Sequence, residues 1–156
     1  MDEALQQPSE VPPPRERLPF SRRTRVLIVD DMAENRQMLA LCCDQFGVCH
    51  EWAADGREAV EAAASGRFDL VLMDILMPRM DGITATRAIR ALPEPVSQTP
   101  IIAVTTAAAP GEVVRYLACG MNDVVAKPIN PQRLAQAMIG ALAPARRRRK
   151  PAGRAA

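Results

Sequence analysis

Leu70-Val71-Leu72-Met73-Asp74 places a carboxylate directly after four apolar residues, the pattern of a buried strand that ends in a reactive group. Three other short apolar runs end in the same way. They are Val26-Leu27-Ile28-Val29 before Asp30 and Asp31, Ile101-Ile102-Ala103-Val104 before Thr105, and Val124-Val125-Ala126 before Lys127. Uninterrupted apolar runs of this length are typical of strands that are buried on both faces of a parallel sheet.

Helical segments are predicted between these strands, so the two kinds of element alternate along the chain. The predicted strands cover 25–29, 48–53, 68–73, 100–104 and 123–126. The predicted helices cover 33–46, 56–65 with Asp55 as its N-terminal cap, 83–91, 110–118 and 131–142. Strict alternation of this kind is typical of a parallel sheet with helices on both faces. We therefore expect an α/β fold with a doubly wound, five-stranded parallel sheet, forming a single domain over residues 25–143.

The two ends of the chain differ from this central region in composition. Residues 1–24 contain five prolines and few apolar residues, so we expect a disordered leader rich in proline and arginine. Residues 144–156 hold six basic residues and no acid, and we expect a disordered, arginine-rich tail. Residues 26–143 carry 14 acidic and nine basic residues, a net charge of −5. The net charge of +2 for the whole chain therefore averages an acidic domain and basic ends.

Several classes of protein are excluded or disfavoured by composition. No apolar stretch approaches the roughly 20 residues that a membrane span requires, and the N-terminus lacks the pattern of a secretion signal. The four cysteines are not spaced as a disulfide framework or a zinc site, which favours reduced thiols in a cytoplasmic protein. The basic run 146–150 could neutralise nucleic-acid phosphates, but no aromatic stacking residue accompanies it. A solvated tail is therefore favoured over a nucleic-acid-binding arm.

The polar groups at the strand ends are expected to meet in one cleft. The carboxyl ends of parallel strands share one edge of the sheet, where open α/β sheets bind ligands. Carboxylate oxygens are ligands that Mg²⁺ prefers, and a carboxylate can also accept a phosphoryl group to give an acyl phosphate. The Lys127 ammonium and the Thr105 hydroxyl can hold phosphoryl oxygens. An acidic pair alone is as well explained by a helix cap or turn, so the prediction depends on all four strand ends together.

At these residues the chain resembles the receiver domain of two-component response regulators, over about residues 24–143. Four segments carry the resemblance: 26–31 with the acidic pair, 72–82 (Leu-Met-Asp-Ile-Leu-Met-Pro-Arg-Met-Asp-Gly), 101–105 and 126–129 (Ala-Lys-Pro-Ile). The resemblance implies a flavodoxin-like (βα)5 fold. It also implies that the domain catalyses its own phosphorylation and a slow hydrolysis of the product, and is otherwise not an enzyme.

The resemblance further implies a role for each site residue. Asp74 would be the phosphoacceptor, taking its phosphoryl group from a histidine kinase or a histidine phosphotransfer protein, while Thr105 and Lys127 would hold the phosphoryl oxygens. Asp31 would bind Mg²⁺ directly and Asp30 mainly through water. The metal ligands that the resemblance implies are Asp30, Asp31, Asp74 and the backbone carbonyl of Leu76. It also implies a cis peptide bond between Lys127 and Pro128.

The function expected from the resemblance is a phosphorelay receiver with output through protein contacts on the 110–142 face. The receiver could stand alone or be a module of a longer hybrid histidine kinase. A phosphatase with an aspartyl nucleophile is an alternative of another class. That enzyme would need an acid two residues after Asp74 as its general acid and base, and Leu76 occupies that position.

Two aromatic positions add further expectations. Members of the family usually carry Tyr or Phe three residues before the lysine, where this chain has Val124. The aromatic ring swings inward in the family when the phosphoryl group draws in the threonine, and valine has no ring to move. Trp52, on the second predicted strand, is expected to be partly buried.

Overall fold

The structure is a computed structural model and describes residues 20–149, with side chains described as far as residue 143. Its elements in chain order are β1 (Arg25–Val29), α1 (Ala33–Phe46), β2 (Cys49–Ala53), α2 (Gly56–Ala64), β3 (Leu70–Met73), α3 (Gly82–Arg90), a short 3-10 helix η1 (Val96–Gln98), β4 (Ile101–Thr105), α4 (Pro110–Ala118), β5 (Asp123–Ala126) and α5 (Pro131–Arg149). Residues 1–19 of the predicted leader and 150–156 of the predicted tail lie outside the described residues.

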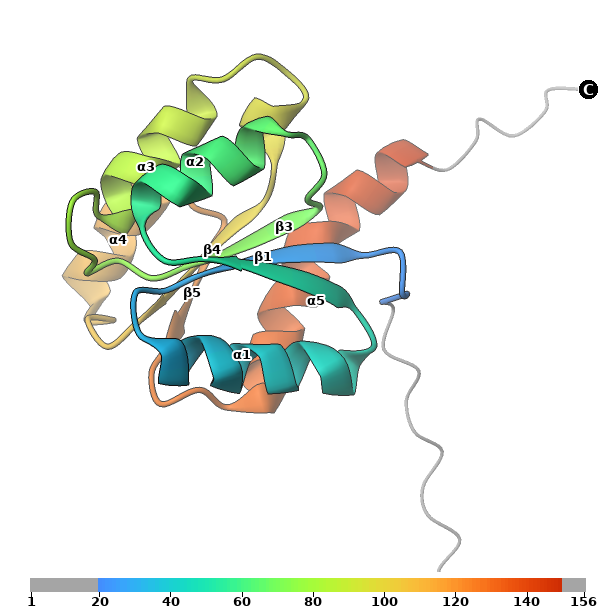
Figure 1. The fold of residues 1–156 in the computed structure, drawn as a ribbon, viewed down its shortest axis with the longest axis horizontal. Helices are drawn as coiled ribbons and strands as arrows, with labels where there is room; N and C mark the ends of the chain where they lie inside the picture. Colours follow the sequence, from blue (N-terminus) through green and yellow to red (C-terminus); the bar gives the residue numbers. More distant parts are fainter. Residues whose placement is uncertain (1–19, 150–156) are drawn as a thin grey trace, which may run out of the picture.

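The five strands form one parallel sheet in the order β2-β1-β3-β4-β5. Helices α1 and α5 cover one face, and α2, α3 and α4 cover the other (Figure 1). The predicted doubly wound α/β fold is therefore confirmed. The chain leaves β1 toward β2 and returns to β3 on the opposite side, so the strand order reverses between β1 and β3. Open α/β sheets form their ligand crevice at such a reversal.

Burial on both faces explains why the strand sequences are apolar without alternation. In β1, Leu27 and Val29 face the apolar cluster under α2, α3 and α4, whereas Val26 and Ile28 face the cluster under α1 and α5. All four side chains are at most 1% exposed. Because neither face of the strand meets water, both faces need apolar residues.

Helices α2 and α3 begin at aspartate caps. Asp55 caps α2, as the sequence predicts: its side chain accepts from the Glu58 N–H at 2.9 Å, and Glu58 in turn accepts from the Ala54 N–H at 2.8 Å. Asp81 caps α3 by accepting from the Thr84 N–H at 2.7 Å, which the sequence reasoning did not predict. Each cap fixes where its helix starts relative to the strand before it.

The structure corrects the sequence-based expectations at three places. Helix α5 does not end near Leu142 but continues to Arg149, so residues 144–149 of the expected tail are helical. Arginine and alanine are strong helix formers, and they extend the helix past Pro144. Phe20, in the expected leader, packs against Phe46 of α1 in a tilted ring pair with centroids 5.9 Å apart. Trp52 is 59% exposed, since β2 is an edge strand.

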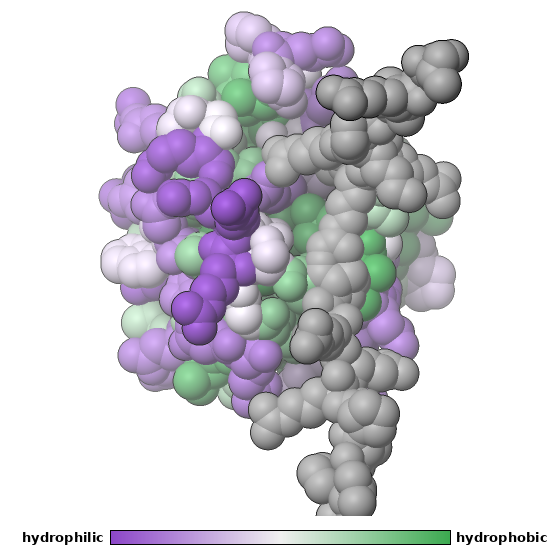
Figure 2. Space-filling view, turned by 90° about the vertical axis from the view of Figure 1, so that its right-hand side faces the viewer, coloured by the Kyte–Doolittle hydropathy of each residue, from purple (hydrophilic) through white to green (hydrophobic). Residues whose placement is uncertain are grey.

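The molecular surface is mixed in character. Figure 2 faces the side where the strands begin, and hydrophilic residues cover much of that side with hydrophobic ones in small groups between them. Across residues 20–149, no helix has the length and the apolar character needed to cross a membrane.

Candidate functional site

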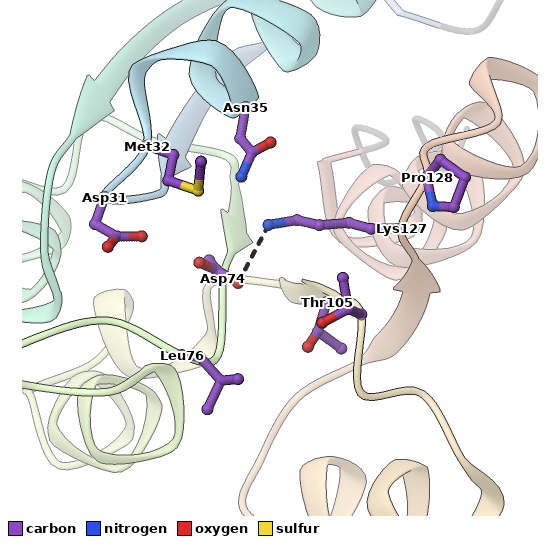
Figure 3. Close-up of a pocket in the computed structure, with 9 residues that line it drawn as sticks. Asp31, Met32, Asn35, Asp74, Leu76, Thr105, Lys127 and Pro128 are labelled. Carbon is purple, nitrogen blue, oxygen red and sulfur yellow. Dashed lines mark hydrogen bonds and ion pairs between the residues drawn. The ribbon is translucent and has the colours of Figure 1, made fainter.

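A cleft of about 510 Å³ lies at the carboxyl ends of the strands, where the predicted groups meet. Asp31 and Asn35 line it after β1, Asp74 and Leu76 after β3, and Lys127 after β5, and Thr105 lines it at the last position of β4. Figure 3 shows the Lys127 side chain reaching across this cleft toward Asp74. The structure thus brings the predicted strand-end groups together.

Three carboxylates form the acidic part of the site. One oxygen each from Asp30, Asp31 and Asp74 lie within 4.8 Å of one another. Asp30 is fully buried and Asp74 is 7% exposed, whereas Asp31 is exposed at the mouth of the cleft. A compact set of hard oxygen donors with one open side suits a hydrated divalent cation such as Mg²⁺. The residues present therefore fit a metal ion of that class.

Asp30 is held firmly behind the cleft. One carboxylate oxygen accepts from the Met32 N–H at 2.9 Å and from the Asn35 side-chain amide at 3.3 Å. The other pairs with the Lys127 ammonium at 2.9 Å. Arg36 also donates to the Asp30 backbone carbonyl at 2.9 Å. These contacts fix the carboxylate and tie the start of α1 to the site.

Asp74 has weaker compensation for its charge. Its carboxylate accepts from the Ile75 N–H at 2.9 Å and meets the Lys127 ammonium at 3.4 Å. Burial raises the pKa of Asp74 and the charge of Asp30 raises it further, while Lys127 and the Ile75 N–H act in the opposite direction. Lys127 serves two buried carboxylates and lies nearer to Asp30. The Asp74 carboxylate is consequently the less stabilised anion of the pair.

Gly82, the first residue of α3, packs against the backbone of Asp74. Its N–H donates to the Ile75 carbonyl at 2.9 Å. A Cβ at this position would overlap the Asp74 carbonyl oxygen and lie 3.0 Å from both the Asp74 carbonyl carbon and the Ile75 Cα. Glycine is required here by close approach, and this approach sets the position of the Asp74 backbone.

Thr105, Lys127 and Leu76 also line the cleft. Thr105 is 1% exposed, and its hydroxyl accepts from the Ala107 N–H at 3.1 Å. The Lys127–Pro128 peptide bond is cis, as the resemblance implied. Leu76 is 68% exposed, so an apolar side chain stands at the edge of the cleft where a phosphatase would need its second acid.

Four further residues line the cleft: Met32, Asn35, Thr106 and Pro128. The sequence reasoning singled out neither Met32 nor Asn35. The position of Asn35 in the sequence could have predicted its place in the cleft. It lies in the first turn of the helix that follows the acidic pair, so its amide is placed to reach back to Asp30. The other three lie next to predicted site residues in the sequence.

Comparison with known proteins identifies the family and the fold. The family model of the response regulator receiver domain matches residues 26–139. The chain belongs to this family. The receiver is 43% identical over 109 residues to the signal transduction histidine-protein kinase BarA of Escherichia coli K12, covering 70% of this chain and 12% of BarA. It is 38% identical over 114 residues to the transcription factor SKN7 of Saccharomyces cerevisiae, covering 73% of this chain and 18% of SKN7.

Solved receiver structures share the architecture. The receiver domain of the sensor histidine kinase PA1611 from Pseudomonas aeruginosa superposes with a TM-score of 0.71 at 35% identity, covering 77% of this receiver and 98% of that chain, and it holds a magnesium ion in its active-site cleft. The chemotaxis protein CheY4 of Vibrio cholerae gives a TM-score of 0.70 at 35% identity, covering 76% and 98% of the two chains. The flavodoxin-like receiver fold is thereby confirmed. The chain spans less than a fifth of the BarA and SKN7 sequences.

Proposed function

We propose that Asp74 accepts a phosphoryl group from the phosphohistidine of a histidine kinase or a histidine phosphotransfer protein. The observation that carries this proposal is the Asp74 carboxylate, which lines the cleft beside the Lys127 ammonium with the other two carboxylates close by. A carboxylate oxygen attacks phosphorus and the P–N bond to imidazole breaks. The imidazole nitrogen keeps the electron pair and takes up a proton, and Asp74 becomes an acyl phosphate.

Two residues are placed to receive the new phosphoryl oxygens. The Lys127 ammonium is 3.4 Å from an Asp74 oxygen, so it is within reach of a group bonded to that carboxylate. The Thr105 hydroxyl lines the same cleft and can donate to a second oxygen. Hydrogen bonds to charged oxygens are roughly twice as strong as those between neutral groups. Both contacts therefore favour the phosphorylated state.

The metal site follows from the same carboxylates. Its proposed ligands are Asp30, Asp31, Asp74 and the backbone carbonyl of Leu76. A bound Mg²⁺ neutralises negative charge on the transferring oxygens. Asp30 is already held by the Lys127 ammonium and the Met32 N–H, which supports an indirect role for Asp30 and a direct one for the exposed Asp31.

The proposed output is through protein contacts on the 110–142 face. Helix α4 exposes Val114 and Leu117, which are 67% and 47% exposed, and exposed apolar side chains of this size are common where proteins bind partners. A stand-alone regulator and a module of a longer hybrid kinase are both compatible with relatives such as BarA. An aspartyl phosphatase is disfavoured by Leu76. A cytoplasmic location, and the absence of a nucleic-acid partner for the basic run 146–150, stay predictions.

The proposal is tested by phosphorylating the full chain with acetyl phosphate in Mg²⁺ and measuring intact mass. Wild type should gain the mass of one phosphoryl group, and Asp74→Asn should gain none. Asp81→Asn is the matched control, because Asp81 caps α3 in the next loop and should leave the adduct intact. An adduct on Asp74→Asn at the wild-type level, or none on wild type, contradicts the proposal.

A further inference from the structure

Tyr116 is a buried polar aromatic residue that the proposed chemistry does not use. It is the single tyrosine of the chain and lies in α4 with 1% of its surface exposed. Its hydroxyl donates to the Ala107 carbonyl at 2.9 Å. Its ring belongs to the apolar cluster between the sheet and α2, α3 and α4, and Val124 of β5 belongs to the same cluster. A large ring from the helix and a small residue of the strand thus belong to one apolar cluster.

A short chain of hydrogen bonds connects this tyrosine to the cleft. The Ala107 N–H donates to the Thr105 hydroxyl at 3.1 Å, and the Ala107 carbonyl accepts from Tyr116. Burial raises the pKa of Tyr116, the Glu112 charge adds to the rise, and a hydrogen bond with Thr105 acts against it. Ala107, in the loop between β4 and α4, is therefore the single residue that links the Thr105 hydroxyl in the cleft to Tyr116 in α4.

The Thr105 hydroxyl has a stronger partner once the cleft is filled. Its present partner is the uncharged Ala107 amide, whereas a phosphoryl group on Asp74 offers charged oxygens. When Thr105 turns to the phosphoryl group, the Ala107 N–H loses its acceptor and the half-buried Ala107 peptide must find another. The Ala107 carbonyl moves with that peptide, and it carries the bond to Tyr116.

We infer that Tyr116 is the positioning residue through which a phosphoryl group on Asp74 moves α4, acting by way of Thr105 and Ala107. The inference rests on the proposed function of Asp74. Coupling between the threonine and an aromatic ring, which Val124 cannot provide because it has no ring, is thereby assigned to a tyrosine of α4. Val114 and Leu117 flank Tyr116 in the same helix and are exposed. A change in the Tyr116 anchor therefore changes how these two apolar side chains are presented to a partner.

The single tyrosine makes a direct test possible in the full chain. Protein labelled with ¹³C in the tyrosine ring gives signals from Tyr116 alone, and these are recorded with Mg²⁺ before and after adding beryllofluoride, a stable mimic of the phosphoryl group. Wild type should show shifted Tyr116 ring signals, and a second sample uniformly labelled with ¹⁵N should show shifted backbone amides at Val114 and Leu117. Thr105→Val should lose the ring shift. Thr106→Val, which removes the neighbouring exposed hydroxyl of the cleft, should keep it.

The Tyr116→Phe variant separates coupling from packing. Phenylalanine keeps the buried ring, so the variant should fold and gain the same mass from acetyl phosphate as wild type. It should lose the beryllofluoride-dependent amide shifts at Val114 and Leu117, which a merely structural role would leave in place. A wild-type adduct with unmoved Tyr116 signals, or unchanged α4 shifts in Tyr116→Phe, overturns the inference alone. The absence of any adduct on wild type overturns the proposed function, and this inference with it.

Discussion

Gly82→Ala should slow the phosphorylation of Asp74 without removing any reacting group. The glycine has no left-handed backbone conformation to preserve, so the substitution adds a methyl group and little else. That methyl group overlaps the Asp74 carbonyl oxygen. To restore ordinary contact, the Asp74 backbone and the start of α3 must separate by about 1 Å. Misplacement of a reacting group by about 1 Å can cost roughly 100-fold in rate.

The overlap also has a cost for the fold. Overpacking of a close-packed site typically costs 1–3 kcal/mol, so we expect Gly82→Ala to lose about 2 kcal/mol of unfolding free energy. Gly140→Ala is the matched control, since a Cβ there meets nothing within 4 Å and alanine in a helix interior gains about 0.5–1 kcal/mol. The assays are urea unfolding and the rate of adduct formation from acetyl phosphate by intact mass. A Gly82→Ala rate within about threefold of wild type would refute the geometric reasoning.

Three further predictions concern buried polar groups. Asp74→Asn should raise the unfolding free energy in EDTA at pH 7 and leave it unchanged at pH 3. Because the pKa of Asp74 is raised in the folded state, its contribution to stability is fully present below the ordinary carboxyl pKa near pH 4. That contribution is lost as the pH rises and the buried carboxyl group ionises. Equal effects at both pH values in urea unfolding would contradict it. Lys127→Met should cost about 3 kcal/mol in EDTA because two buried carboxylates lose their cation, and Mg²⁺ should recover part of that loss. No loss by urea unfolding would contradict this. Thr86→Val should stabilise the fold by about 1 kcal/mol, because the buried Thr86 hydroxyl has no hydrogen-bond partner among the described residues; thermal unfolding below wild type would overturn this.

The fold was predictable because buried parallel strands produce recognisable patterns in the sequence. Burial on both faces produced the uninterrupted apolar runs, and the carboxyl ends of those runs had to meet at one edge. The convergence of Asp74, Thr105 and Lys127 followed from that geometry alone. Asp55 was predictable as a cap because the acidic residue directly precedes a helical pattern.

Features that depend on loops and on neighbours across the sheet were not predictable in this way. The Arg90 guanidinium donates to the carbonyls of Ser97, Thr99 and Gly120 and to the Asn122 side chain, joining loops far apart in sequence. The burial of Tyr116 depends on an apolar cluster whose members come from several strands and helices far apart in the sequence. The end of α5 was missed because a proline signals a helix end locally, whereas strong helix formers on both sides of it can continue the helix.

The cleft concentrates negative charge that the metal-free protein compensates only in part. Among the described residues that line or close it, the carboxylates of Asp30, Asp31 and Asp74 are accompanied by the ammonium of Lys127. Two of the three carboxylates are buried, which removes the water that would otherwise screen their repulsion. Burial and the charge of Asp30 together raise the pKa of Asp74, and they also lower the stability of the fold at neutral pH and favour the binding of a divalent cation. Stability, metal affinity and the reactivity of the Asp74 carboxylate therefore have one electrostatic origin, and a substitution that relieves the repulsion should gain stability and lose metal affinity together.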